Sequence, residues 1–453
     1  MGRDALAGSA QHSSSETRRP GLLGGFSEFL KLEIAGSVLL LGATVLALVI
    51  ANTAAHAAFE SLLHVEIGFE IGRWTFAQSL KHWIDDGLMA LFFFVIGLEV
   101  KREMVVGELS KPRQALLPVV AALGGMLVPA AIYVALNAGG AGLRGWGIPM
   151  ATDIAFVLGV LTVLGSKAPA GLKLFVTALA IADDIGAILV IALFYSSGIS
   201  LTWLAAGAVL LAVLALLNAL KVDSAVPYAL LGVAVWFCFL NSGVHATIAG
   251  VLVAFTIPTR ARLSPLEFVE RSRDRLEAIE LVDDPDAHVL DDDVQQNCAL
   301  ELGHDSVLIA SPLQRMEHAL HPLTTFLVLP LFALANANLR LVGLDVGALL
   351  VQPVTLGVFF GLLIGKPVGI AAFSWLAVKM GLTELPKGLS WRHVIGGGVL
   401  GGIGFTMSLF VANLAFRADA MLLDEAKLAV LGTSVVAGIA GYLFLRAAAR
   451  PAA

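Results

Sequence analysis

Two adjacent aspartates, Asp183 and Asp184, stand in the middle of the apolar stretch ALAIADDIGAILVIALF. Ionisable side chains are expensive inside a membrane, which makes them functional candidates wherever they occur there. Two carboxylates in a poorly solvated site cannot both be ionised easily, so they titrate as one coupled unit. Their hard oxygen atoms also suit Na+ or Li+ as ligands. A proton and a monovalent cation can therefore compete for this site, which is the minimum that ion exchange requires.

Neighbours on a helix point about 100° apart, so one carboxylate can face a water-filled passage while the other faces a neighbouring helix. Lys366 lies far from either end of its own apolar run, LLIGKPVGI. A buried ammonium needs a partner. We predict that Lys366 pairs with Asp183, and that the pair breaks when the acid is protonated or when sodium binds at Asp184. The alternatives are a hydrogen-bonded structural pair of aspartates and a lysine that snorkels to the membrane surface.

Thr152 and Asp153 follow a proline in IPMATDIAF. Thr and Asp favour helix starts, where their side chains accept hydrogen bonds from free backbone N–H groups. We therefore predict a broken helix whose second half begins here, although N-capping alone would also explain Asp153. The glycines between 396 and 404 predict a matching break near Gly402–Thr406. Paired breaks in two halves of a chain indicate a site between inverted repeats, a rule that was established on membrane proteins of known structure.

Other ionisable residues lie near the ends of apolar runs. His245, in SGVHATIAG, could tune a response to pH because imidazole titrates near neutrality, or it is a satisfied core histidine. The remaining residues could sense pH or form an ion funnel, or they are ordinary solvated helix ends. They are Asp86, Glu99, Arg102, Glu103, Glu317 and His321.

The composition is that of an all-α membrane protein. Of the 453 residues, 58% are apolar and 14% are charged, whereas soluble domains carry about a quarter charged residues. A spanning helix needs about 20 mostly apolar residues, and we count about twelve such stretches. No basic stripe or stacking-aromatic motif indicates a nucleic-acid partner. The candidate spans are 34–54, 83–101, 115–137, 147–165, 171–196, 201–220, 225–241, 243–258, 321–338, 353–380, 393–416 and 424–446.

The distribution of Lys and Arg predicts the orientation. Most of them fall in the segments that alternation places on the same side as the N-terminus, which puts both termini in the cytoplasm. We divide the chain into a cytoplasmic N-terminal tail (1–33), a membrane domain (34–449) with a long cytoplasmic loop at 259–320, and a C-terminal tail (450–453). Residues 1–20 lack the apolar core of a cleaved signal peptide and are typical of a disordered tail.

Two segments outside the spans have patterns of their own. Residues 64–71 (HVEIGFEI) alternate polar and apolar side chains, which predicts a strand in a small extracytoplasmic β-hairpin. In the loop 259–320, the Arg-rich part from Glu267 to Glu280 predicts a solvated helix. The acidic part after it is a flexible linker or a divalent-ion site that lacks the spacing of a calcium loop. Cys238 and Cys298 have no metal-type spacing, so we expect two unpaired thiols.

With these residues in view, the chain resembles the NhaA family of sodium/proton antiporters. The motifs that carry the resemblance occur in the family's order between about 83 and 408. They are WIDDGLMALFFFVIGLEVKRE, IPMATDIAFVLGV, ALAIADDIGAI, SGVHATIAG, LPLFALANA, LLIGKPVGI and GGIGFTMS. This sequence departs from the family in a loop at 259–320 that is long and acidic. It also has Asp85 beside Asp86, where the family commonly has an amide, which would make the outer funnel more negative.

The resemblance implies twelve helices in inverted repeats, with two interrupted helices crossing near the membrane midplane. It implies that Asp184 is the more direct cation ligand and that Asp183 pairs with Lys366. Thr152 and Asp153 would lie at the crossing, with Asp153 compensating half-helix N-termini and Lys366 the C-terminal ends. It also implies a homodimer formed through the hairpin near 64–71. The positions that match the family's pH response are Glu99, Arg102, Glu103, Glu317 and His245.

We therefore expect a secondary active antiporter, and not an enzyme, in a bacterial cytoplasmic membrane. It would export Na+ or Li+ in exchange for H+ by electrogenic, pH-regulated alternating access, with no cofactor. One rival is a sodium-coupled symporter of an organic solute, which would need a larger polar cavity. A second is an intramembrane aspartyl hydrolase, whose acids should come from two helices and converge on one water. A passive channel would conduct without coupling.

Overall fold

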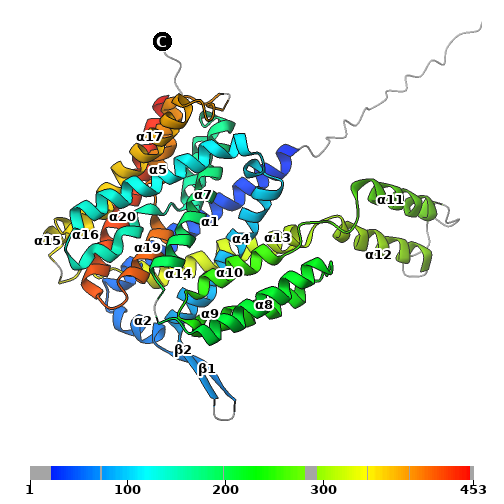
Figure 1. Cartoon of the computed structure of the whole chain (residues 1–453), viewed down its shortest axis with the longest axis horizontal. Helices are drawn as coiled ribbons and strands as arrows, with labels where there is room; N and C mark the ends of the chain where they lie inside the picture. Colours follow the sequence, from blue (N-terminus) through cyan, green and yellow to red (C-terminus); the bar gives the residue numbers. More distant parts are fainter. Residues whose placement is uncertain are drawn as a thin grey trace, which may run out of the picture.

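The structure is a computed structural model of the chain and is mostly helical (Figure 1). It describes residues 22–71, 74–196, 198–280, 293–343, 345–386 and 388–448. The predicted disordered tail at 1–20, nearly all of the predicted acidic linker and the predicted C-terminal tail lie outside these ranges. Cys238 and Cys298 are free thiols, as predicted.

The prediction of a multi-pass membrane protein is confirmed. In the described ranges, nine helical stretches are long and apolar enough to cross a membrane, and a bent helix pair brings the number to ten. The nine are Ile34–Ala51 in α1 (Leu22–Ala51), α5 (Pro112–Asn137), η3 (Ala141–Met150) with α6 (Ile154–Leu164), α7 (Ala170–Phe194), α8 (Leu201–Ala219), α9 (Ala225–Ser242), α13 (Pro312–Leu323) with η5 (Thr324–Val328) and α14 (Leu329–Asn336), α16 (Pro353–Phe360) with η6 (Gly361–Gly365) and α17 (Lys366–Lys379), and α20 (Ala420–Ala448).

Two predicted spans correspond to shorter or irregular elements. The span at 83–101 is the π-helix η1 (Trp83–Leu88) followed by α4 (Met89–Val105), and the span at 243–258 is α10 (Ala246–Thr256). Helices α4 and α10 pack closely and run in the same direction, with Gly250 against Ala90 and Gly97 against Ala254.

Both predicted helix breaks are present. The 3₁₀-helix η3 ends at Met150 and α6 begins at Ile154, with Asp153 as its N-cap residue. Late in the chain, α18 (Trp391–Gly401) and α19 (Phe405–Ala415) are bent by 46° at the break between them. The two breaks give the membrane region four helix ends that must find hydrogen-bond partners inside the protein.

Two π-helical turns stand just before prolines. Segment η6 ends one residue before the Lys366-Pro367 pair, and η5 ends shortly before Pro330. Proline has no N–H to donate and its ring clashes with the preceding turn, so the helix widens locally instead of breaking.

The helices form two groups. The broken-helix bundle comprises α5, η3–α6, α7, α16–α17, α18–α19 and α20, in which α17 packs on α5 and α18, and α16 packs on α5 and α20. The companion bundle comprises η1–α4, α8, α9, α10 and α13–α14, in which α10 packs on α4 and α9. It has a core of its own, formed around Tyr228, Val235 and Ile248. Helix α1 contacts both groups through α6 and α14.

The predicted hairpin is present. Strands β1 (Glu66–Ile71) and β2 (Trp74–Ser79) pair antiparallel, between α2 (His56–Leu63) and α3 (Leu80–His82). The indole N–H of Trp83 donates to the carbonyl oxygen of Ile67 at 2.9 Å. The ring of Phe76 packs edge-on against Trp83 and Phe237. We call this end of the molecule the hairpin side (Figure 1).

The opposite end is the loop side, which α4 and α10 reach with their last residues. Here α11 (Pro265–Glu280), which confirms the predicted solvated helix, packs against α12 (Asp293–Leu308), which the sequence did not reveal (Figure 1). Helix α13 begins at Pro312, inside the predicted loop 259–320, and its start is marked by a capping box of Ser311 and Gln314. The short elements η2 (Glu108–Ser110), η4 (Gly165–Lys167) and α15 (Val346–Leu350) complete the described chain.

Candidate functional site

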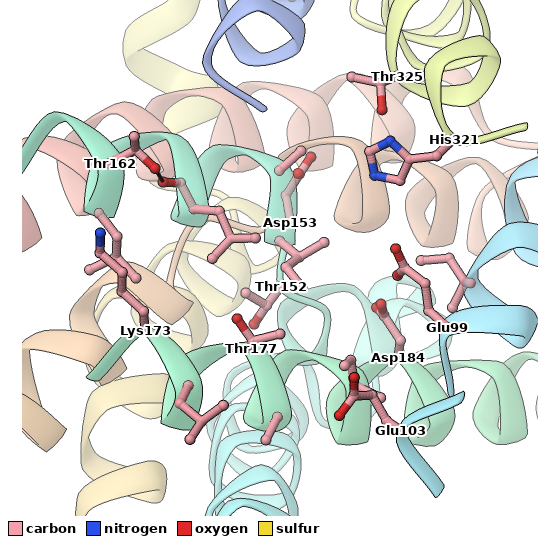
Figure 2. Close-up of a pocket in the computed structure, with 18 of the residues that line it drawn as sticks. Glu99, Glu103, Thr152, Asp153, Thr162, Lys173, Thr177, Asp184, His321 and Thr325 are labelled. Carbon is pink, nitrogen blue, oxygen red and sulfur yellow. Dashed lines mark hydrogen bonds between the residues drawn. The ribbon is translucent and has the colours of Figure 1, made fainter. Parts of the chain in front are cut away.

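A cavity of about 900 Å³ lies between the two bundles and extends inward from the loop side. Its walls come from α4, α6, α7, the α13–η5–α14 helix and the start of α19 (Figure 2). Polar side chains occupy both its mouth and its inner end. They are Glu99, Arg102, Glu103, Thr152, Asp153, Thr162, Lys173, Thr177, Asp184, His321, Thr324, Thr325 and Thr406.

The two adjacent aspartates of α7 face different surroundings, as predicted. Asp184 lines the cavity, and Figure 2 shows its carboxylate beside that of Glu99. Asp183 points to another helix, where its Oδ2 accepts a hydrogen bond from Lys366 Nζ at 2.6 Å. The structure therefore contains the predicted Lys366–Asp183 pair. One carboxylate can exchange ions with water in the cavity while its neighbour is held by a fixed cation.

Lys366 is almost fully enclosed, with 1% of its surface exposed. Besides Asp183, its ammonium donates to the hydroxyl of Thr152 at 2.8 Å, and that hydroxyl donates to the carbonyl oxygen of Gly401 at 3.0 Å. Gly401 ends α18, so the Thr152 hydroxyl links the positive charge to the C-terminal end of a broken helix through two hydrogen bonds. This burial excludes the snorkelling alternative for Lys366.

The lysine is held in place by a close approach of α5 to α17. A Cβ atom on Gly124 would lie 2.2 Å from the carbonyl oxygen of Gly369, and one on Gly369 would lie 2.1 Å from that of Gly124. Glycine at both positions is what lets two membrane helices come together at this distance. The Lys366 stem then lies against Gly125.

Asp153 joins the N-terminal ends of both half-helices. Its Oδ1 caps α6 by accepting from the N–H of Phe156 at 3.4 Å. Its Oδ2 accepts from the N–H of Thr406 at 3.0 Å and also from the Thr406 hydroxyl. The N–H of Asp153 itself donates to the carbonyl oxygen of Ile403 at 2.7 Å. The two breaks therefore contact each other directly, with a buried carboxylate on the positive ends of two helices.

At the cavity mouth, charged residues of α4 meet α13. The Arg102 guanidinium donates to Glu317 Oε1 at 2.5 Å and to Glu103 Oε1 at 3.3 Å. His321, one turn after Glu317 on the same face of α13, lines the cavity together with Glu99. The predicted group of Glu99, Arg102, Glu103 and Glu317 is thus brought together on the loop side.

Asp86 and His245 lie elsewhere. They are on the hairpin side, where His245 Nδ1 is 3.6 Å from Asp86 Oδ1, and neither lines the cavity. The structure therefore does not bring them together with the residues of the mouth. Asp85, the extra acid of the sequence, pairs with Lys81 at 3.3 Å.

Sequence reasoning missed some residues of the site. Thr406 was noted only as the edge of a break, although Thr at a helix start is a recognisable capping signal. Lys173 and Thr177 of α7 line the cavity on the same helix as Asp184. Lys173 lies about three turns and Thr177 about two turns before Asp184, so a helical projection from Asp184 would have found them.

The buried pair predicts a specific stability pattern. Replacing Lys366 by Met should lower the free energy of unfolding by about 3–5 kcal/mol, because Asp183 then becomes a buried charge without a partner. The double variant Lys366→Met/Asp183→Asn should recover much of that loss, since neither charge remains. Chemical or thermal unfolding of the purified protein in detergent measures both. Losses that simply add in the double variant would show that the two side chains do not act as a pair.

Comparison with known proteins identifies the family. The family model described as Na+/H+ antiporter 1 matches residues 27–445. A protein named Na(+)/H(+) antiporter NhaA from Oleidesulfovibrio alaskensis is 48% identical over 428 residues, which cover 94% of each chain. Na(+)/H(+) antiporter NhaA 2 from Syntrophotalea carbinolica is 49% identical over 94% of this chain and 97% of its own. With its membrane-spanning helices and this match across most of its length, the chain belongs to the Na+/H+ antiporter 1 family of NhaA proteins.

Proposed function

We propose that this protein exports Na+ or Li+ from a bacterial cytoplasm in exchange for protons. The observation that carries the proposal is that two neighbouring carboxylates have different surroundings. Asp184 lines a cavity that reaches the loop side, whereas Asp183 is held by Lys366. The relatives' names, Na(+)/H(+) antiporter, support the same function.

In the proposed cycle, Na+ enters from the cavity and binds at Asp184, which lines the same cavity as Thr152 and Asp153 (Figure 2). Hard oxygen ligands suit this cation. Its arrival displaces protons from the aspartates. Protons arriving from the other side reverse these steps. Competition for one site is sufficient to couple the two fluxes.

We infer that the site is exposed alternately to the two sides of the membrane. The contact between the two helix breaks supports this, because half-helices that meet only at their ends can shift without unwinding a continuous helix. Twelve helices arranged as inverted repeats, with the breaks crossing near the midplane, fit this mechanism. The cavity on the loop side corresponds to the inward-facing state of such a cycle.

The exchange is proposed to be electrogenic. If both carboxylates release a proton for each Na+ taken up, every cycle moves one net positive charge into the cell. A negative-inside membrane potential then drives Na+ outward, with about 2.3 kcal/mol per charge per 100 mV. Protonation of the aspartates at low pH would exclude Na+ and stop the exchange. We propose that Glu99, Arg102, Glu103 and Glu317 at the mouth, and Asp86 and His245 on the hairpin side, adjust the pH range in which this occurs.

The exchange is tested by following proton movement in proteoliposomes with a pH-sensitive dye, after adding Na+, Li+ or K+ at several pH values. We expect Na+ and Li+ to discharge the proton gradient above neutral pH and to have little effect at low pH. Asp184→Asn should abolish the response, because the cation loses its charged ligand. Glu317→Gln should move the pH range without abolishing exchange. A potential that is negative inside right-side-out vesicles should accelerate Na+ exit.

A matched control is Asp223→Asn, which removes a carboxylate that pairs with Arg262 outside the cavity. This variant should exchange like the wild type. Folded protein that shows no response to Na+ at any pH would refute the antiporter proposal. Uptake of an organic solute, or cleavage of a peptide, would instead identify a symporter or a hydrolase.

We propose that both termini and the loop side face the cytoplasm, since Lys and Arg concentrate in the loops on that side. A cysteine at Thr177, which lines the cavity, reports on this orientation. In a background with Cys238 and Cys298 changed to serine, Thr177→Cys should react with a membrane-impermeant maleimide in inside-out vesicles and remain unlabelled in right-side-out vesicles. The opposite pattern would mean that the orientation is inverted.

We also propose that two copies associate through the hairpin. Strands β1 and β2 form a two-stranded sheet, so each has an edge that the other strand leaves unpaired, and such edges readily pair with another chain. A two-stranded hairpin is marginal by itself and gains stability from such pairing. Shortening the hairpin by replacing residues 68–77 with two glycines should convert the dimer into a monomer, measured as mass in detergent by light scattering. An unchanged mass would place the dimer contact elsewhere.

A further inference from the structure

Polar side chains join the two bundles on the hairpin side, at the end opposite to the cavity mouth. Three residues of the broken-helix bundle take part, and each reaches a partner in the companion bundle or in the chain next to it. We call this set the hairpin-side seam. It consists of Arg417 with Asp86 and His245, Asn413 with Asn336, and Lys427 with Asn338.

Asp86 is the centre of the seam. It is 3% exposed, and two histidines and one arginine surround its carboxylate. His82 Nε2 lies 3.3 Å from Oδ2, while His245 Nδ1 and Arg417 Nη2 lie 3.6 and 3.8 Å from Oδ1. The Arg417 guanidinium also donates to His245 Nε2 at 3.1 Å. Of these groups, only Arg417 belongs to the broken-helix bundle, directly after α19, so it is the cation that ties that bundle to Asp86.

The other two contacts continue the seam along α14. The Asn413 amide donates to Asn336 Oδ1 at 3.1 Å, and that same oxygen accepts from Lys81 at 2.6 Å. Lys427, near the start of α20, donates to Asn338 Oδ1 at 3.1 Å. Each contact is a hydrogen bond that water can replace, unlike the packing of an apolar core.

An aromatic layer lies beneath the seam. The Phe410 ring of α19 is 5.4 Å from Phe93 of α4 and 6.1 Å from Phe332 of α14, between ring centroids. All three side chains are fully buried. Thr406, Phe410 and Asn413 recur at helical spacing, so one face of α19 carries the contact to Asp153, the aromatic layer and the seam in succession.

This arrangement gives α19 two linked contacts. Its first turn reaches the ion site. Farther along the helix, Phe410 contacts α4 and Asn413 contacts α14, and Arg417, just after its end, reaches Asp86 in η1. On the loop side the cavity already leads to Asp184, so passage from the hairpin side requires that α19 separate from α4 and α14. The seam and the aromatic layer are what prevent that separation.

We propose that Arg417 is the latch of the hairpin-side gate, and that release of its contacts with Asp86 and His245 opens the path from that side to the ion site. This inference rests on the proposed alternating access. The Arg417 side chain is 56% exposed although Asp86 is buried, so water can take over its hydrogen bonds during opening. Arg417 is not among the residues that line the cavity, and it acts by positioning α19.

The test is the reactivity of a buried cysteine below the seam. Ala333 is fully buried and lies one turn deeper than Asn336 on the same face of α14. In protein with Cys238 and Cys298 changed to serine, Ala333→Cys should react slowly with an impermeant maleimide in right-side-out vesicles. Adding Arg417→Gln should raise the labelling rate about fivefold, which is the upper range for a partly exposed ion pair. Arg417→Lys should return the labelling rate toward that of the Ala333→Cys protein that keeps Arg417, because a cation again faces Asp86.

Arg340→Gln is the matched control, since it removes an exposed arginine from the same side, for which no ion pair occurs with the described residues. It should leave the labelling rate unchanged. A labelling rate that is the same with and without the Arg417→Gln substitution, in protein that unfolds at the same temperature, would overturn the latch. An equal increase in the Arg340→Gln variant would also overturn it, because the effect would then follow from charge alone.

The readout separates this inference from the proposed function. Labelling that rises in the Arg417→Gln variant without any Na+-dependent proton movement in the parent protein would support the gate and refute the antiporter. Proton movement that depends on Na+, with labelling unaffected by the substitution, would support the antiporter and refute the gate.

Discussion

Backbone groups at the ends of interrupted helices cannot be left without hydrogen bonds in a medium that contains no water. In this protein two helix interruptions meet, and each provides hydrogen-bond partners for some backbone groups of the other. Asp153 accepts hydrogen bonds at the starts of both α6 and α19, and its own N–H donates to Ile403 at the other break. A carboxyl side chain is thereby buried beside two positive helix ends instead of beside lipid. Most of the polar architecture follows from this contact.

Lys366 compensates the other kind of helix end at the breaks, the C-terminal end, whose carbonyl groups also need partners. Its hydrogen bond to Thr152, and that of Thr152 to Gly401, place a positive charge near the negative end of α18. Because this charge is enclosed, it also needs an anion, which Asp183 supplies. The adjacent Asp184 does not pair with Lys366 and lines the cavity instead. The site that we propose for ion exchange thus arises from how a membrane protein compensates broken helices.

Much of this could be predicted from residue types. A pair of aspartates and a lysine in apolar runs indicate a buried ion pair, and Thr-Asp and the run of glycines indicate the two breaks. The helical character of 293–308 could not be predicted, because its hydrophobic periodicity is weak beside an acidic stretch. The early start of α13 was marked by Ser311 and Gln314, a capping signal that the hydropathy of the following span concealed. Arg417 was missed for another reason: it stands in a polar turn, and its partners are far away in the sequence.

Residue composition and order are sufficient to predict that the chain crosses a membrane many times, where its helices break and which ionisable residues lie within the apolar region. These properties depend on local composition and on periodicity, because the hydrocarbon core of a membrane admits only apolar segments whose backbone groups are hydrogen-bonded within the protein. The packing of the helices is needed to show which of the two aspartates faces the cavity and which faces Lys366, since neighbours on a helix differ only in direction. It also decided that Asp86 and His245 lie at the end away from Glu317, because the bundle joins segments from distant parts of the chain.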